Sequence, residues 1–186
     1  MEAHEAAAIE RAKAGDRDAF RELVERHSRG VFRLGYRMTG NSTDADDVVQ
    51  ETFFRAWKQI RAFDGRAAFG SWLYRIAANH AVDLVRARGR YDSSEPAETR
   101  VALAAAGDFA QDRLVYAGQV SGRIEQAMGQ LTPRERAAFV LRHFEGQSID
   151  EICRALGLRT NAAKQCIFRA VQKLRRALKP VVEAAR

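Results

Sequence analysis

The stretch DADDVVQETFFRAW, residues 44–57, decides the fold, and the segment FGSWLYRIAANHAVDLVRAR, residues 69–88, supports it. Apolar side chains recur through the first stretch at helical spacing, which predicts a helix with one buried stripe. The other side chains must face outward, and they are mostly acidic or carry amides. The buried stripe is expected to comprise Ala45, Val48, Val49, Phe53, Ala56, Trp57 and Ile60.

Carboxylates open this predicted helix directly after the turn of residues 40–43. Negative charge is favoured at a helix N-terminus by the macrodipole, so the first-turn aspartates need no function. Gln50 and Glu51 extend the polar face into the second turn, which the macrodipole does not explain. A metal-dependent nuclease would need carboxylates converging from more than one element, and the sequence has no second carboxylate motif. The first-turn group comprises Asp44, Asp46 and Asp47.

The chain is predicted to be all-α, because no segment alternates polar and apolar residues convincingly and only three prolines occur in 186 residues. A first helix is expected at residues 3–14. A second helix should begin at a cap, Asp16 or Asp18, and end at Gly40. The loop that follows the acidic helix, residues 61–70, holds two phenylalanines, and apolar side chains in a loop usually plug a core.

The next helix, expected at residues 71–88, should pack through one side and expose a basic side. Residues 61–90 carry six arginines against two aspartates, a local charge of +4. Such a surface faces phosphates or is simply solvated. Aromatic residues interleaved with the arginines favour the first interpretation, because rings offer stacking platforms for single-stranded bases. The outward residues are expected to be Arg75, Asn79, Arg86 and Arg88.

Residues 91–119 differ in composition from both flanks, with an alanine run and an excess of acidic over basic side chains. We interpret them as a linker with one short helix near residues 112–117. The linker divides the chain into two small helical domains, residues 1–90 and residues 120–186.

The second domain contains the pattern of a helix-turn-helix. In LTPRER, Thr132 is placed to cap a helix, with Pro133 at its first position and Glu135 at its third. Ala137, Val140, Leu141 and Phe144 are expected to form the buried face of this helix. Ser148 should cap the short helix IDEICRAL, and Gly157 should end it before a basic helix that starts with Thr160 as a plausible cap.

The basic helix is the expected DNA reader, because residues 159–179 hold seven lysines or arginines and no acid. Recognition helices enter the major groove by their N-terminal turns. We therefore assign base reading to Asn161, Lys164, Gln165 and Phe168. The flanking Arg159, Thr160, Arg169, Lys173 and Arg175 complete the predicted surface, with the cationic side chains on phosphates.

Composition supports a nucleic-acid partner. The formal net charge is +7 and the pI about 9.9, which favours a polyanion, nucleic acid first and an anionic membrane second. No apolar run reaches membrane-spanning length and the first residues are too charged for a signal peptide, so the protein is expected in the cytoplasm without membrane insertion. The two cysteines and four histidines lack metal-site spacing, so no metal, cofactor or enzyme chemistry is predicted.

Residues 18–90 resemble region 2 of the extracytoplasmic function (group IV) sigma factors of bacterial RNA polymerase. The D-x-V-x-Q-E-x-F core and the W-L-Y-R-I-A-x-N block carry this resemblance in combination. Residues 120–179 resemble region 4 of the same family through LTPRER, SIDEICRALGL and NAAKQCIFRAVQKLR. Cys166 and Phe168 depart from the arginine and histidine that are common in the family at those positions.

The resemblance implies a transcription initiation factor rather than an enzyme. Region 2 would dock on the clamp helices of the polymerase largest subunit through Asp47, Gln50, Glu51 and Arg55. It would also open the minus-ten DNA and capture a flipped base in the 61–70 loop, assisted by Asn79. Region 4 would read the minus-thirty-five element, and an anti-sigma protein is a further implied partner. The implied minus-ten surface comprises Phe63, Phe69, Trp72, Arg75, Asn79, Arg86 and Arg88.

A stand-alone helix-turn-helix regulator with an N-terminal sensor or dimerisation domain is the alternative. Many activators end in a block similar to LTPRER, so the last quarter of the chain does not separate the two hypotheses. The discriminating feature is the first domain, because a regulator needs neither the Gln50-Glu51 face nor the block from Trp72 to Asn79.

Overall fold

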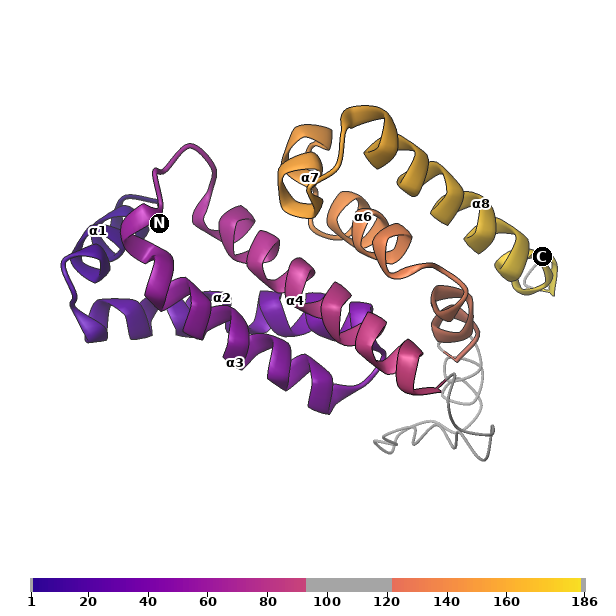
Figure 1. The fold of residues 1–186 in the computed structure, drawn as a ribbon, viewed down its shortest axis with the longest axis horizontal. Helices are drawn as coiled ribbons and strands as arrows, with labels where there is room; N and C mark the ends of the chain where they lie inside the picture. Colours follow the sequence, from indigo (N-terminus) through magenta and orange to yellow (C-terminus); the bar gives the residue numbers. More distant parts are fainter. Residues whose placement is uncertain (1, 93–121, 185–186) are drawn as a thin grey trace.

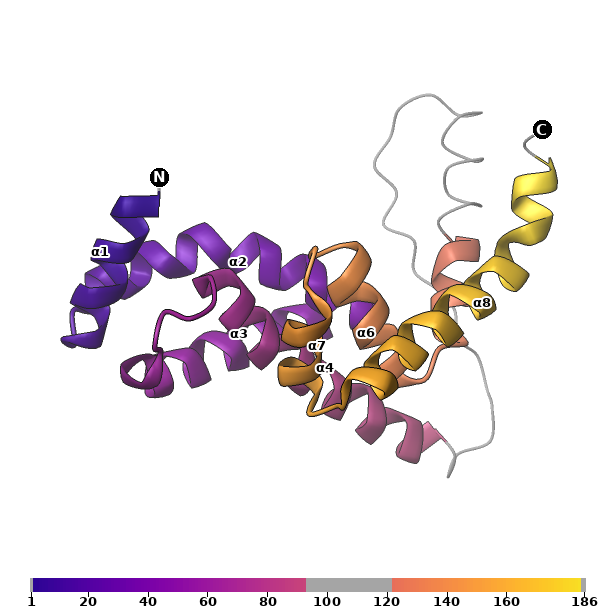
Figure 2. The same cartoon turned by 90° about the horizontal axis from the view of Figure 1, so that it is seen from above.

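The structure is a computed structural model that describes residues 2–92 and 122–184, and every regular element in those ranges is helical (Figures 1 and 2). The all-α prediction is confirmed. Residues 122–129 are helical as well. The named elements are α1 (Glu2–Lys13), α2 (Arg17–Thr39), α3 (Ser42–Gln59), the short 3-10 turn η1 (Ile60–Ala62), α4 (Phe69–Asp92), α6 (Pro133–His143), α7 (Ile149–Leu156) and α8 (Thr160–Ala184).

The first half is a bundle in which α2, α3 and α4 pack against one another, with α1 laid on α2 and η1 (Figure 1). The α3 stripe lies largely as its spacing predicts, because Val48 and Ala56 are fully buried and Val49 and Trp57 are partly buried. Leu34 and Met38 of α2 and Leu73 of α4 complete the centre of the bundle. The rotation of α3 about its axis is therefore set by hydrophobic burial.

Local capping sets the ends of α2 and α3. Asp16 is the cap of α2, since its carboxylate accepts hydrogen bonds from the N–H groups of Asp18 and Ala19 at 2.9 and 3.0 Å. Gly40 ends that helix with φ 79°, a conformation that favours glycine. Asn41 caps α3 through the N–H of Asp44 at 2.7 Å, so α3 begins two residues earlier than its first aspartate.

The predicted caps of α6 and α7 are confirmed, whereas the one predicted for α8 is not. Thr132 and Glu135 form a capping box at the start of α6, with Pro133 in its first turn. Ser148 and Glu151 form a second capping box at the start of α7. Gly157 ends α7 with φ 62°, which turns the chain into α8. Thr160 is the first residue of α8 rather than its cap.

The two halves pack directly on each other, an arrangement that the sequence did not predict. α6 and α7 lie against α4, and α6 also contacts α2, whereas α8 lies on α6 and α7 and points away from the first half (Figures 1 and 2). One continuous hydrophobic cluster joins the halves. The start of α1 and the end of α8 lie at opposite ends of the molecule (Figure 1).

Several expectations need correction. Phe144 was predicted to be buried, but it follows the last residue of α6 and its side chain is 51 % exposed. Asp44 was placed on the outward face, but it is only 5 % exposed. α4 begins at Phe69 and continues to Asp92, so the expected linker starts inside a helix. The short helix expected near residues 112–117 lies outside the described residues.

Leu73→Ala is expected to destabilise the fold by about 2–5 kcal/mol, because Leu73 is fully buried at the centre of the bundle and truncation would leave a cavity. Urea unfolding followed by circular dichroism measures this loss. Phe54→Ala is the control, since the Phe54 side chain is 55 % exposed, and it should cost less than about 1 kcal/mol. Equal losses for the two variants would contradict the packing described above.

Candidate functional site

The predicted docking residues form one outward stripe on α3. Asp47 and Gln50 are exposed, and Glu51 and Arg55 are partly exposed one turn further along. Arg55 Nε donates to Glu51 Oε1 at 2.5 Å. This hydrogen bond lowers the pKa of Glu51 against the opposing effect of desolvation, so the carboxylate is ionised at neutral pH. The structure therefore brings the four predicted residues together as a charged surface.

His80 of α4 lies beside this stripe, a position that the sequence analysis did not predict. Burial lowers the pKa of His80, and the Arg55 guanidinium lowers it further, while Glu51 and two aspartates oppose the shift. The imidazole is therefore neutral at pH 7 and can accept or donate one hydrogen bond. Helical spacing within α3 alone does not reveal this neighbour, because His80 reaches the stripe only through packing of α4 on α3.

Phe54 is a second residue that sequence reasoning missed. Its ring is exposed beside the stripe, and Lys58 Nζ lies 3.9 Å from the ring centroid. The sequence contained a signal for this exposure. Phe53 lies on the buried stripe, and successive side chains on a helix point about 100° apart, so Phe54 must point away from that stripe. An exposed aromatic ring next to paired charges is typical of a protein-binding surface.

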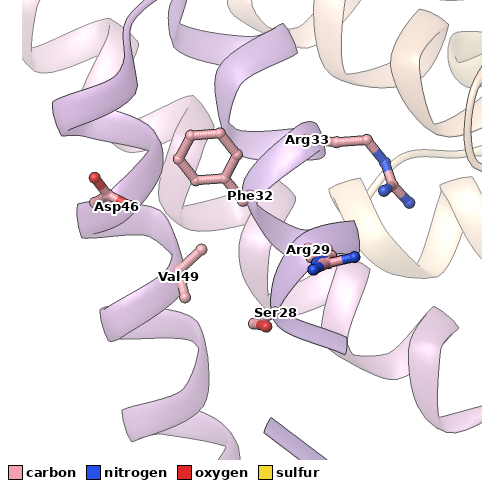
Figure 3. A pocket seen from close by; sticks show the side chains of 6 residues that line it. All are labelled: Ser28, Arg29, Phe32, Arg33, Asp46 and Val49. Carbon is pink, nitrogen blue, oxygen red and sulfur yellow. The ribbon is translucent and has the colours of Figure 1, made fainter. Parts of the chain in front are cut away.

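A groove between α2 and α3 adjoins this surface (Figure 3). Phe32 and Val49 supply its apolar part, and Asp46 lies on the α3 side. Arg29 and Arg33 extend to the other side of α2 (Figure 3). Neither arginine has an ion-pair partner in the described part of the chain. Ser28 completes the lining.

The Asp44 carboxylate has a structural partner in Arg88. The two side chains form an ion pair that ties the end of α4 to the beginning of α3. Asn41 Nδ2 also donates to the Asp44 carboxylate at 3.1 Å. Arg88 was predicted to face minus-ten DNA, and in this structure its guanidinium is instead engaged with a buried acid. The contact pairs residues 44 apart, which sequence spacing does not show.

The phenylalanines of the 61–70 loop plug the core. Phe63 and Phe69 are 7 % and 2 % exposed, and their ring centroids lie 5.3 and 5.4 Å from that of Trp72, which is partly buried. His27 packs edge-on against Phe69 at 5.4 Å. Neither phenylalanine presents a face on which a base could stack, so in this structure they shape the loop rather than line an open pocket.

The outward side of α4 matches its prediction. Arg75, Asn79 and Arg86 are exposed. Asn79 Nδ2 donates to the Arg75 carbonyl oxygen at 3.0 Å, so its amide oxygen takes no part in this contact and can still accept from a further donor. Arg61 and Arg66 of the preceding segment are exposed as well, so the surface remains basic over its length.

The N-terminal part of α8 presents the predicted base-reading residues to solvent. Asn161, Lys164 and Gln165 are exposed, and the Phe168 side chain is 64 % exposed. Arg169 Nη2 lies 3.5 Å from Gln165 Oε1, a contact at the limit of a hydrogen bond. Arg159 and Thr160 are exposed at the start of the helix. The structure therefore brings these seven residues together at one end of α8.

Lys173 departs from the role predicted for it. Its Nζ donates to Glu135 Oε2 at 2.7 Å, and the Glu135 side chain is nearly buried. Desolvation opposes ionisation of Glu135, but the hydrogen bonds from Lys173 and Thr132 outweigh it and lower the pKa. Lys173 therefore joins α8 to the start of α6, a contact between helices that its predicted phosphate role did not include.

The described ranges give no indication of a metal site, a reactive thiol or a membrane-spanning helix. No group of three or more His, Cys, Asp or Glu side chains there could hold a metal ion. Cys153 and Cys166 are free, and burial raises the pKa of the Cys166 thiol, which disfavours the reactive thiolate. Among residues 2–92 and 122–184, no helix combines the length and apolar character needed to cross a bilayer.

Comparisons with known proteins match both halves of the chain. Residues 23–91 match the family model of Sigma-70 region 2, and residues 121–174 match that of Sigma-70 region 4. The chain is 33 % identical to the ECF RNA polymerase sigma factor SigW of Bacillus subtilis, covering 92 % of this chain and 95 % of SigW. It is 32 % identical to the RNA polymerase sigma-H factor of Pseudomonas aeruginosa, covering 95 % of each.

A solved structure shares the arrangement of the helices. CnrH, an RNA polymerase sigma factor of Cupriavidus metallidurans, has been solved in complex with the cytosolic domain of CnrY. It superposes with a TM-score of 0.68 at 29 % identity, covering 95 % of this chain and 98 % of CnrH.

Glu135→Gln is expected to reduce the dependence of stability on pH. Because the pKa of Glu135 is lowered in the folded chain, its stabilising effect is present above the ordinary value of 4.5 and is lost as the pH falls through the folded-state value. Urea unfolding at pH 7 and pH 3 should therefore show a smaller loss on acidification in the variant, by on the order of 1 kcal/mol. Glu10→Gln, on an exposed carboxylate, should behave as the wild type.

Proposed function

The chain belongs to the ECF family of RNA polymerase sigma factors, and from that premise we propose how its two halves divide the work. It directs RNA polymerase to promoters. Residues 1–90 dock on the core enzyme and open the minus-ten DNA, residues 120–186 read the minus-thirty-five element, and residues 91–119 link them. The regulator alternative is not favoured, because the sigma-factor relatives match along both halves.

The exposed stripe of α3, opposite its buried stripe, supports the docking proposal. Asp47, Gln50, Glu51 and Arg55 are held outward because the opposite side of the helix is locked into the bundle core. Ionised Glu51, paired with Arg55, offers directional hydrogen bonds to a partner helix. Phe54 adds apolar area that a partner would desolvate, as aromatic anchors do at the centre of interfaces.

The basic side of α4 supports the minus-ten proposal. Arg75 and Arg86 are placed to hold phosphates, while Asn79 offers a free amide oxygen to a base. Trp72 is partly buried and lies at the edge of the aromatic cluster, so it is the ring of that cluster best placed to meet an unstacked base. The buried rings of Phe63 and Phe69 hold the loop against the core and are not assigned a contact with DNA.

The exposed end of α8 supports the minus-thirty-five proposal. Lys164 and Gln165 have the donor and acceptor groups that read guanine and adenine edges, and Phe168 can contact a thymine methyl. Arg159, Arg169 and Arg175 are exposed and hold phosphates. Lys173 serves the fold through Glu135.

The protein acts in the cytoplasm as an initiation factor and catalyses no bond chemistry of its own, which core polymerase performs. An anti-sigma protein is proposed as a regulator, supported by the similarity to CnrH, which was solved with the cytosolic domain of CnrY.

Gln50→Ala combined with Glu51→Ala is expected to abolish binding to core RNA polymerase, because it removes the central hydrogen-bonding groups of the stripe. The wild type should produce new, discrete transcript starts from sheared genomic DNA with core polymerase, and the double variant should produce none. A pull-down measures the binding directly, and circular dichroism checks the fold. Glu25→Ala with Gln130→Ala, exposed residues outside the stripe, should leave both readouts unchanged. Undiminished pull-down of a folded Gln50 and Glu51 variant would remove the docking proposal.

Lys164→Ala and Gln165→Ala are expected to change which upstream bases are preferred, with a cost of about 1–3 kcal/mol on the preferred site. Arg169→Ala should weaken all promoters about equally and lower the salt dependence of binding. Initiation across a promoter library with randomised upstream positions distinguishes the two effects. Identical preference profiles for the three variants would show that the division into base readers and phosphate contacts is wrong.

A further inference from the structure

Helix α1 reaches both ends of the 61–70 loop, which the proposed function makes the receptor of a minus-ten base. Lys13 Nζ lies 5.6 Å from the ring centroid of Phe63, near the start of the loop, within the range of a cation–π contact. At the other end, His27 of α2 joins α1 to Phe69, the first residue of α4. α1 thus supports both phenylalanines that close the loop, one directly and one through His27.

The His27 side chain makes contacts on two sides. Its Nε2 donates to Glu5 Oε1 at 2.5 Å, a hydrogen bond that connects α2 to α1. Its ring centroid lies 5.4 Å from that of Phe69 in an edge-on arrangement. A Cβ added to Gly70 would lie 3.6 Å from the ring atoms Cε1 and Nδ1, so the ring also lies against the first turn of α4. The imidazole therefore separates α1 from the end of the loop, and Glu5 fixes its orientation.

The contact between Glu5 and His27 is not what holds α1 on the fold. Ala8, Ile9 and Ala12 of α1 are buried in the hydrophobic core, and they account for the attachment of this helix. A partly buried polar pair adds little net stability, because removing both groups from water opposes the gain from pairing them. The same pair fixes one relative geometry, since a hydrogen bond is directional. It is therefore suited to setting the position of the His27 ring rather than to stabilising the bundle.

The exposed tip of the loop is carried by two packed rings. Residues 64–66 are exposed and form a local turn, in which the Asp64 carboxylate accepts from the N–H of Arg66 at 3.0 Å. Beneath this turn the rings of Phe63 and Phe69 meet edge to face, with centroids 5.4 Å apart and planes at 86°. A receptor for an unstacked nucleotide base must hold its shape to within about 0.5 Å. A shift of the Phe69 ring would move the tip, so whatever holds that ring also sets the receptor.

We propose that Glu5 and His27 are positioning residues for minus-ten recognition. Glu5 orients the His27 ring, and the ring holds Phe69 and the first turn of α4, so that the 61–70 loop keeps the shape that receives an unstacked base. Neither residue is assigned a contact with DNA, and the inference rests on the proposed function of the first half. The docking stripe lies on α3, whereas α1 packs on α2 and η1, so loss of the pair should leave core binding intact.

Base preference in opened minus-ten DNA tests this role. The templates carry a promoter obtained from the new transcript starts, with its minus-ten region held open by mismatches, and each non-template base is varied in turn. With core polymerase, the wild type should prefer one base by at least about fivefold at the position that the loop receives. His27→Ala and Glu5→Ala should each reduce this preference to less than about twofold, with preferences at the other positions and pull-down of core polymerase unchanged. The double variant should be no worse than either single one, because both residues act through one ring.

Two further variants separate positioning from a general effect on the fold. Glu5→Gln should keep the wild-type preference, because its amide oxygen can still accept from the His27 ring. Glu25→Ala, on an exposed residue of α2, is the control and should change nothing. Circular dichroism confirms that each variant is folded.

Three outcomes would contradict the inference. An unchanged preference in folded Glu5→Ala and His27→Ala variants overturns the positioning role alone. A parallel loss of core binding and of every base preference also overturns it, because the pair would then serve the fold as a whole. A wild type with no base preference anywhere in the opened strand overturns the minus-ten role of the first half together with this inference.

Discussion

Burial of the α3 stripe is the constraint on which the rest of the first half depends. Val48 and Ala56 are fully buried between α2 and α4, and a helix fixed on one side can present only the opposite side to a partner. The outward position of Gln50 and Glu51 is thus a consequence of hydrophobic packing. Asp44 lies in the first turn of the same helix but on its buried side, where Arg88 neutralises it.

Charged residues of this chain have two distinct uses, and local charge density does not separate them. Glu135 with Lys173 and Asp44 with Arg88 connect helices, and in each pair the acid is almost fully buried. Arg75, Lys164 and Arg169 remain exposed, and in the proposed function they contact partners outside the chain. A run of basic residues predicts a DNA-facing surface, but which members of the run are available is decided by the acids that the fold brings near. That information lies in the tertiary contacts.

Features set by neighbours in the sequence were predicted well. The caps at Thr132 and Ser148, the break at Gly157 and the all-α class follow from residues within one or two turns. The positions of Phe63 and Phe69 remained ambiguous, because an aromatic loop can plug a core or receive a base, and only burial distinguishes the two. His80 beside Arg55, and Phe144 outside the core, depend on how helices meet. The contact between the halves left no periodic signal at all.

In the proposed function, the spacing of two modest DNA-reading surfaces decides whether they can bind one promoter together. A tethered pair gains affinity only when both can engage at once, and a spacing that does not match the sites removes this gain. In the proposed function, core polymerase fixes the two halves at the promoter spacing and so makes their joint contribution possible. In that proposal, selectivity for the complex over the free protein follows from the spacing that core polymerase imposes on the two surfaces.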